Sequence, residues 1–204
     1  MRRALILMLG LAMSYNLVAQ EAAKQKEVGI VFSNLDHFGL TYKTGTAKSM
    51  WRFTTLFISG SNFTDSNDDM ENKQTNLGFG LKIGKEFRKE LASNLEFRYG
   101  ADISFAYSKV KSEYDDITVA DVDRLNEQSL YKPGANLMLG LNYKLSDNFV
   151  IGAELMPGFV YTTGASINKT TISGVENEVK DDVSGFNFDL TNNSVLLSLV
   201  YRLK

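Results

Sequence analysis

Residues 136–163 alternate between bulky apolar and small or polar side chains, and this alternation limits the fold more than any other feature of the chain. In residues 136–145 every second side chain is Leu or Tyr, and the pattern resumes at 149–163 after a three-residue polar turn. Alternate residues of a strand point to opposite faces, so the two runs predict a β-hairpin. The bulky face is broad, whereas the other carries glycines, small polar groups and a carboxylate. Because large side chains should fill the core of a water-soluble sheet, this distribution favours a bulky face that contacts lipid.

The amino terminus has the three regions of a secretory signal peptide. Arg2 and Arg3 precede an apolar run at 4–13, and small residues follow up to Ala19. We expect residues 1–19 to be the signal peptide, with cleavage after Ala22 as the alternative, residues 20–26 to be a flexible lead, and residues 27–204 to form one domain. No internal segment approaches the roughly 20 apolar residues of a membrane helix. The chain has no cysteine, so an exported domain must be stable without disulfides, as a closed sheet in lipid can be.

Period-two alternation predicts eight strands in total, at residues 27–33, 37–43, 48–60, 75–87, 95–112, 136–145, 149–163 and 192–204. The first two are shorter than the roughly 9–11 residues that cross a bilayer. Merging them would leave seven strands, and single-chain bacterial barrels have even numbers, so we retain two. Long loops are expected at 61–74, 113–130 and 164–191, and short turns between the other strands. The predicted fold is therefore an all-β, eight-stranded antiparallel up-and-down transmembrane barrel with short periplasmic turns and longer outer loops.

The chain resembles the small eight-stranded outer-membrane β-barrel proteins of Gram-negative bacteria, the OmpA/OmpX-type group. The resemblance rests on its signal peptide, strand count, loop alternation and lipid-facing aromatic residues. The stretch 35–40 is also similar to small barrels of Bacteroidota. The resemblance implies outer-membrane lipid as the surroundings and barrel-insertion machinery as a partner. Members of the group usually end on an aromatic residue, whereas this chain ends on Lys204 and its nearest aromatic residue is Tyr201.

Charged residues on the inward parity are expected to form a network inside the barrel. Four bases face four acids: Arg52, Lys82, Glu86, Glu96, Arg98, Asp102, Glu154 and Arg202. An eight-stranded barrel is just wide enough for side chains to fill, and an unpaired charge there would be costly to desolvate. We therefore expect a filled polar interior, and a narrow channel for ions or protons through the same charges is the alternative.

The three expected loops are acidic. They hold 15 carboxylates and 4 bases, whereas the chain without Arg2 and Arg3 has a net charge of only −4. Divalent cations, or a basic surface on another cell or protein, are candidate partners, and a solvated surface without ligand is the simpler interpretation. The candidate cation ligands are Asp65, Asp68, Asp69, Asp115, Asp116, Asp181 and Asp182. The stretch 65–71 begins like a calcium loop, but Met70 stands where that loop needs glycine.

An enzyme and a soluble carrier are the alternatives from other classes. His37, the only histidine, could serve an outer-membrane hydrolase with Ser33 and Asp36 nearby in sequence. Neighbours at a strand end point in different directions, however, and no lipase motif surrounds them. A soluble calycin-like ligand-binding barrel conflicts with the charged inner parity and with the exposed rows of Leu, Phe and Tyr. We therefore expect a non-enzymatic envelope or surface-interaction protein without a cofactor, a metal site or a nucleic-acid partner.

Overall fold

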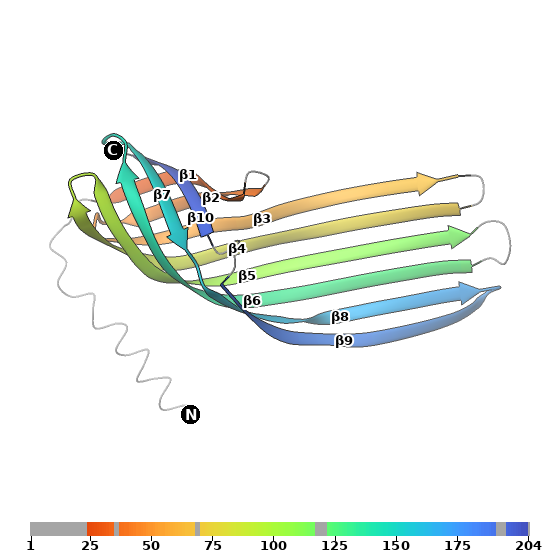
Figure 1. Ribbon diagram of the computed structural model, residues 1–204. Coiled ribbons are helices and arrows are strands. Elements are labelled where there is room, and N and C mark those ends of the chain that lie inside the picture. Colours follow the sequence, from red (N-terminus) through yellow and green to blue (C-terminus); the bar gives the residue numbers. More distant parts are fainter. Residues whose placement is uncertain (1–23, 35–36, 68–69, 117–121, 191–194, 204) are drawn as a thin grey trace, which may run out of the picture.

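The computed structural model describes residues 24–34, 37–67, 70–116, 122–190 and 195–203 (Figure 1). Within these ranges no helix is long and apolar enough to span a membrane. The predicted signal peptide lies outside the described residues, and the first strand begins at Gln25, inside the predicted lead. The strands are β1 (Gln25–Asn34), β2 (His37–Gly45), β3 (Ser49–Ser66), β4 (Met70–Ala92), β5 (Leu95–Asp116), β6 (Val122–Lys144), β7 (Phe149–Leu155), β8 (Gly158–Ile172), β9 (Val175–Asp189) and β10 (Val195–Leu203).

Eight of these strands close into a barrel. β1 to β7 pair in chain order, β7 pairs with β10, and β10 pairs with β1 to complete the ring. All of these pairings are antiparallel, so the predicted eight-stranded barrel is confirmed. β1 and β2 are separate strands of 10 and 9 residues, which is about the length that crosses a bilayer.

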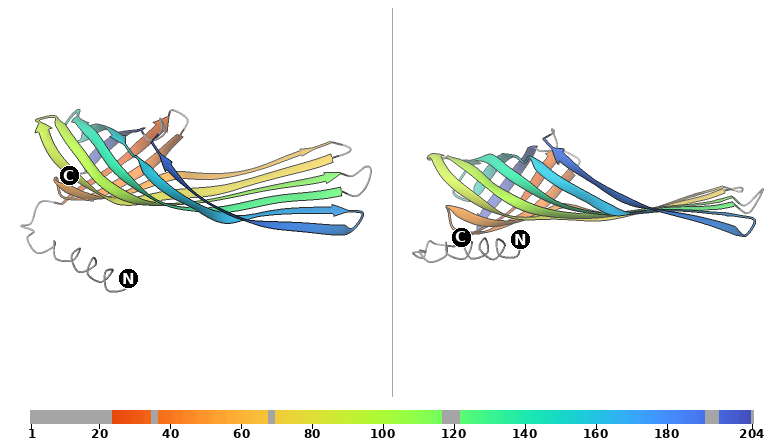
Figure 2. Two further views of the ribbon diagram at one scale, coloured as in Figure 1. Left: turned by 60° about the horizontal axis from the view of Figure 1, so that its bottom comes forward. Right: turned by 90° about the horizontal axis from the view of Figure 1, so that it is seen from below.

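The same ten-stranded sheet continues beyond the ring as an extension, which we call the projecting sheet. It consists of residues 57–66 of β3, 70–80 of β4, 106–116 of β5 and 122–132 of β6, together with β8 and β9, in the order β3-β4-β5-β6-β8-β9. Viewed along its edge, it is a single layer that leaves one side of the barrel (Figure 2). Neither face is covered by another described element.

The projecting sheet corrects the sequence prediction, because the segments 61–74, 113–130 and 164–191 are mostly strand rather than loop. Both faces of this sheet meet water, so its sequence lacks the apolar period that marks a half-buried strand. The strand pairing continues into the projecting sheet because the barrel part of each hairpin already fixes the register of its two strands. β4 and β5, for example, stay paired from Ala92 and Leu95 to Met70 and Asp116.

The predicted strand 149–163 is broken at Met156 and Pro157 into β7 and β8. Proline has no N–H to donate to a ladder, so it ends or interrupts a strand. Before the break β7 pairs with β10 inside the ring, and after it β8 pairs with β9 in the projecting sheet. The Pro157 carbonyl still accepts a hydrogen bond of 2.9 Å from the Leu137 N–H, which keeps both halves beside β6.

The predicted turn at 88–94 is also shorter than expected. β4 runs to Ala92, with an irregular register between Glu90 and Ala92, and only two residues join it to β5. This short turn and those after β2 and β6 lie at the end of the barrel opposite the projecting sheet (Figure 1). Short turns mark the periplasmic side of such barrels, so the projecting sheet points away from the periplasm.

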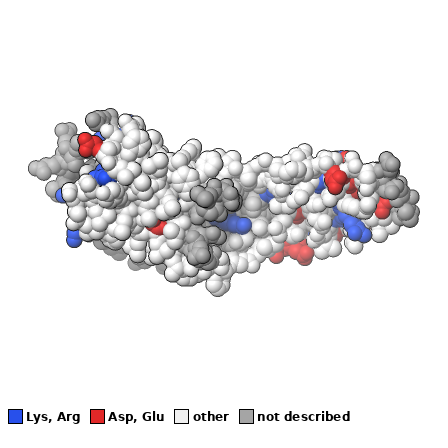
Figure 3. All heavy atoms as spheres, turned by 45° about the horizontal axis from the view of Figure 1, so that its top comes forward, with Lys and Arg blue, Asp and Glu red and all other residues white. Residues whose placement is uncertain are grey.

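The outer wall of the barrel is apolar, as the strand parity predicted. Figure 3 shows a largely uncharged surface over the middle of the barrel, with charged side chains at its far end and on the projecting sheet. Aromatic pairs mark two levels of the wall. The ring centres of Phe149 and Tyr201 lie 5.1 Å apart near the short turns. Those of Tyr107 and Tyr131 lie 5.2 Å apart where the projecting sheet begins. Such pairs match the aromatic girdles at the two membrane interfaces.

Candidate functional site

The barrel interior holds a cluster of buried charges, which we call the interior network. In the described residues it contains six bases and five acids: Lys43, Arg52, Lys82, Arg88, Arg98, Arg202, Glu27, Glu86, Glu96, Asp102 and Glu154. They project from strands β1 to β5, β7 and β10. All eight residues selected from the sequence point into the lumen, and ten of the eleven are at most 8% exposed, with only Arg202 higher.

Glu86 lies at the centre of the interior network and is fully buried. Its carboxylate accepts hydrogen bonds from Lys43 Nζ at 2.8 Å, Arg88 Nε at 2.6 Å and Arg98 at 3.2 Å. Arg52 approaches the same carboxylate at 3.7 Å. Charge-assisted hydrogen bonds of this length are about twice as strong as neutral ones, so one acid from β4 ties together bases from β2, β4 and β5.

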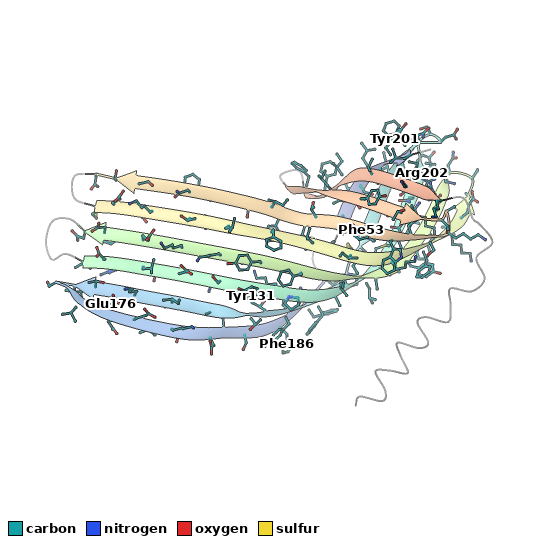
Figure 4. All side chains as sticks on the ribbon, turned by 180° about the vertical axis from the view of Figure 1, so that it is seen from behind. Phe53, Tyr131, Glu176, Phe186, Tyr201 and Arg202 are labelled. Atoms are coloured by element: carbon teal, nitrogen blue, oxygen red, sulfur yellow. The ribbon has the colours of Figure 1, made fainter. Side chains whose placement is uncertain are left out.

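A second layer lies nearer the short turns and closes the ring. Arg88 binds both oxygens of Glu27 at 2.7 Å, the two-pronged geometry that guanidinium and carboxylate prefer. Arg202 Nε contacts Glu27 at 2.9 Å, and another Arg202 nitrogen contacts Glu96 at 2.7 Å. Because Glu27 is on β1 and Arg202 on β10, these bonds link the first and last strands. Figure 4 places Arg202 at the barrel end, beside Tyr201.

The third layer faces the outer end of the lumen. Arg52 binds both oxygens of Glu154, at 3.0 and 2.8 Å, and its Nε lies 3.3 Å from Asp102. Arg98 contacts Glu154 at 3.4 Å. Lys82 Nζ lies 3.2 Å from the sulfur of Met156, at the break between β7 and β8. Together the three layers fill the lumen, as a barrel of this width requires, and every member of the interior network except Lys82 is in an ion pair with another member.

Three members of the interior network were missed by sequence reasoning, although the parity that would have identified them is present. Glu27 alternates with Val28 and Lys43 with Tyr42, but both stand at strand ends. Arg88 shares the parity of Glu86, but it was assigned to the turn that proved to be strand. The expected balance of four bases and four acids therefore becomes six and five.

The candidate cation ligands are not gathered into one site. Asp68 and Asp69 lie outside the described residues, and the other five are on strands of the projecting sheet. The strand register places Asp115 and Asp182 on the face continuous with the outer wall, and Asp65, Asp116 and Asp181 on the other. Among the described residues, no group of three or more His, Cys, Asp or Glu side chains could hold a metal ion.

Acids do gather in one row across the far tip of the projecting sheet. Glu71, Asp115 and Asp123 are direct cross-strand neighbours, and Glu176 continues the row beyond Thr171. Figure 4 places Glu176 at this tip. We call these four carboxylates the acidic row. They line a cleft of about 390 Å³ together with Lys73 and Lys169, which pair with Glu71 at 3.0 Å and Glu176 at 2.6 Å.

At the middle of the acidic row, Asp115 and Asp123 form no ion pair with a base of the described residues. A hydrogen bond with Asp123 raises the pKa of Asp115 above its ordinary value of 3.8, so Asp115 holds its proton more tightly than an isolated aspartate does. Like charges directly opposite each other destabilise a sheet. The row therefore concentrates negative charge where a neutral pair would be more stable.

The side chain of His37 lies outside the described side chains, as do those of Ser33 and Asp36. The imagined serine, histidine and acid trio therefore remains a sequence hypothesis.

No family model matches the chain, and no curated protein matches its sequence. Several solved structures are similar in fold, and three of them are bacterial outer membrane proteins. A major outer membrane protein of Thermus thermophilus has a TM-score of 0.46 at 11% identity, over 89% of this chain and 100% of that one. Ail, the attachment invasion locus protein of Yersinia pestis, has a TM-score of 0.37 at 13% identity, over 90% and 100%. CarO of Acinetobacter baumannii has a TM-score of 0.33 at 12% identity, over 87% and 95%.

The chain's own geometry makes it an outer-membrane β-barrel. The ring is closed, so no strand edge within it faces lipid. Its wall is apolar between two aromatic levels, and its charges lie inside. Outer-membrane barrels combine these features with short turns on one side and long extensions on the other.

Proposed function

We propose that this chain is a non-enzymatic outer-membrane protein of the OmpA/OmpX type that contacts basic surfaces outside the cell through the projecting sheet. The observation that carries the proposal is the acidic row, which lies at the tip of an uncovered sheet of six strands. The partner that this row favours is a basic surface on another cell or protein, because opposite charges steer association.

The filled lumen supports a role outside the barrel rather than transport through it. Arg52 and Arg98 both reach Glu154 across the barrel, and moving any of them aside would leave a buried charge unpaired. Breaking such a buried pair costs about 3–5 kcal/mol. A path for ions would need several of these contacts to open together.

The distance of the acidic row from the membrane also favours an external contact. From Ala106 to Asp115, β5 extends by about 31 Å at roughly 3.4 Å per residue. Exposed charges are screened over about 8 Å at physiological salt, so the row is shielded from anionic lipid headgroups at the base of the sheet. A basic partner would meet the tip without competition from the membrane.

The experiment compares two triple variants of the full barrel in lipid nanodiscs. Glu71→Gln, Asp115→Asn and Asp123→Asn together neutralise the acidic row. The matched control, Asp65→Asn, Asp116→Asn and Asp181→Asn, removes three acids from the opposite face of the same sheet. Binding to a surface coated with polylysine is measured over a series of salt concentrations.

We expect the first triple variant to lose most of the binding and most of its salt dependence, and the control to retain at least half of both. Equal losses in the two variants would mean that net charge, and not the acidic row, governs binding. Unchanged binding in the first variant would reject the proposed contact.

A further inference from the structure

An apolar groove is hollowed into the outer wall, on the side where the strands leave the ring. It has a volume of about 660 Å³ and draws on β3, β4, β5, β6, β8 and β9. Its floor contains the small side chains Ala101 and Ala135, which occupy adjacent rows of neighbouring strands. Trp51 bounds it at the β3 side, and Phe159 and Phe188 bound it at the β8 and β9 side.

The groove exists because two alanines stand among bulky residues of the lipid-facing parity. Ala101 pairs with Leu137, and Ala135 pairs with Ile103. Ile103 is 68% exposed and Leu137 is 63% exposed, whereas Leu81 and Leu141 on the same wall are each 45% exposed. The extra exposure is apolar surface that a neighbouring side chain would otherwise cover.

A lysine stands at one end of this apolar groove. Lys85 is on β4 between the outward residues Phe87 and Ile83, and its Nζ lies 4.9 Å from the centre of the Trp51 ring. A cation over an indole face is held by the ring quadrupole. No carboxylate of the described residues forms an ion pair with Lys85, although almost every interior base has one. A charged side chain on a lipid-facing wall is expensive unless it finds a partner or reaches the interface.

The position of Lys85 on the wall indicates which leaflet of the membrane its ammonium group reaches. It lies one register step beyond the Phe87 and Tyr99 rings, which stack 5.5 Å apart near the short turns. Aromatic residues at that level mark a membrane interface, and short turns mark the periplasmic side. A lysine stem can extend along apolar surface and hold its ammonium at headgroup level. Lys85 therefore belongs to the periplasmic leaflet, whose headgroups carry phosphate.

We propose that the groove is a binding site for one anionic phospholipid of the periplasmic leaflet. The lipid phosphate pairs with Lys85 Nζ beside Trp51, and one acyl chain lies over Ala101 and Ala135 toward Phe188. Charge complementarity selects the headgroup, and the two alanines provide room for the chain. The site is independent of the acidic row, so either proposal can fail without the other.

The single tryptophan of the chain gives a direct test, because Trp51 is itself part of the site. The full barrel is reconstituted in vesicles of phosphatidylglycerol and phosphatidylcholine, in which one or the other carries a brominated acyl chain that quenches indole fluorescence. We expect brominated phosphatidylglycerol to occupy the site about fivefold more strongly than brominated phosphatidylcholine, the preference expected for one lysine near anionic lipid. Equal quenching by the two lipids in the unmodified protein would overturn the proposal.

Four variants separate the site from the rest of the wall. Lys85→Gln should abolish the preference, whereas Lys89→Gln, on the same face nearer the turn, should retain it. Ala135→Phe should weaken quenching by both lipids, whereas Ala153→Phe, an outward alanine of β7 away from the groove, should not. Each variant is first shown to fold by its gel mobility before and after boiling, and the unmodified protein decides the question if a variant does not fold. An unchanged preference in Lys85→Gln, or displacement of the brominated lipid by equimolar lipopolysaccharide, would contradict the assignment.

Discussion

Replacing Glu86 with glutamine should destabilise the barrel, because it removes the carboxylate at the centre of the interior network. The substitution keeps the volume of the side chain and removes its charge. Three of the four bases around Glu86 keep another carboxylate, because Arg88 still binds Glu27, and Arg52 and Arg98 still contact Glu154. Lys43 has no second ion pair in the described part of the chain.

The expected cost is therefore that of one orphaned buried base. Lys43 is 3% exposed and its Nζ lies 2.8 Å from Glu86. Removing one partner of a buried ion pair costs about 3–5 kcal/mol, because the remaining charge stays desolvated. Adding Lys43→Met to Glu86→Gln removes the orphan, so the double variant should recover about 2–3 kcal/mol, the coupling expected for contacting residues.

The assay is urea-dependent unfolding of the barrel in phospholipid bilayers, with the folded fraction read from gel mobility of unboiled samples. Glu90→Gln is the matched control on the same strand. Glu90 is 64% exposed and lies 3.6 Å from Lys144, so its loss should change the free energy of unfolding by about 0–1 kcal/mol. If Glu86→Gln were no more costly than Glu90→Gln, or if Lys43→Met gave no recovery, the interior network would not stabilise the barrel as argued.

Three further outcomes are expected. Glu154→Leu should cost about 3–5 kcal/mol in the same urea assay, because it removes the carboxylate that binds Arg52 through two bonds; an unchanged midpoint would mean that the register of β7 is wrong. The raised pKa of Asp115 means that the folded tip binds its proton more tightly than the unfolded chain does. The resulting stability is complete below the ordinary value of 3.8 and is lost as the pH rises through the higher folded value. Amide exchange at the tip, corrected for intrinsic rates, should show this loss, and Asp115→Asn should remove it. Finally, His37→Ala should leave lipid and peptide hydrolysis by outer membranes unchanged, and a loss of hydrolysis would revive the enzyme.

The sequence predicted the barrel because lipid imposes a strict pattern on it. Each strand of the ring must place apolar side chains on the outer parity, so Leu137 to Leu145 and Val195 to Leu203 could be assigned to faces without a structure. The inward charges followed from the same parity. What parity could not supply was pairing: nothing in the local pattern indicates that Arg52 would meet Glu154 rather than Glu96.

The projecting sheet was missed for the opposite reason. Both of its faces meet water, so polar residues satisfy either side and no period distinguishes strand from loop. Its cue was long-range, namely that β4 and β5 continue in register from the barrel. The break at Pro157 was visible in the sequence, but its consequence was not, because the proline alone does not reveal that β8 would find β9 while β10 returned to β7.

The bond between Glu27 and Arg202 joins residues 175 positions apart, and this separation bears on the order of assembly. Such a distant contact forms only after the chain has lost the conformational entropy of closing a long loop. Until β10 arrives, Glu27 and Glu96 lack their contacts with Arg202 and the barrel has two open edges. The pairing of these buried carboxylates with Arg202 and the closure of the barrel between β1 and β10 therefore happen together, at the end of folding. A chain whose β10 has not yet joined the barrel would keep hydrated charges facing the future lumen and would remain accessible to quality-control proteases.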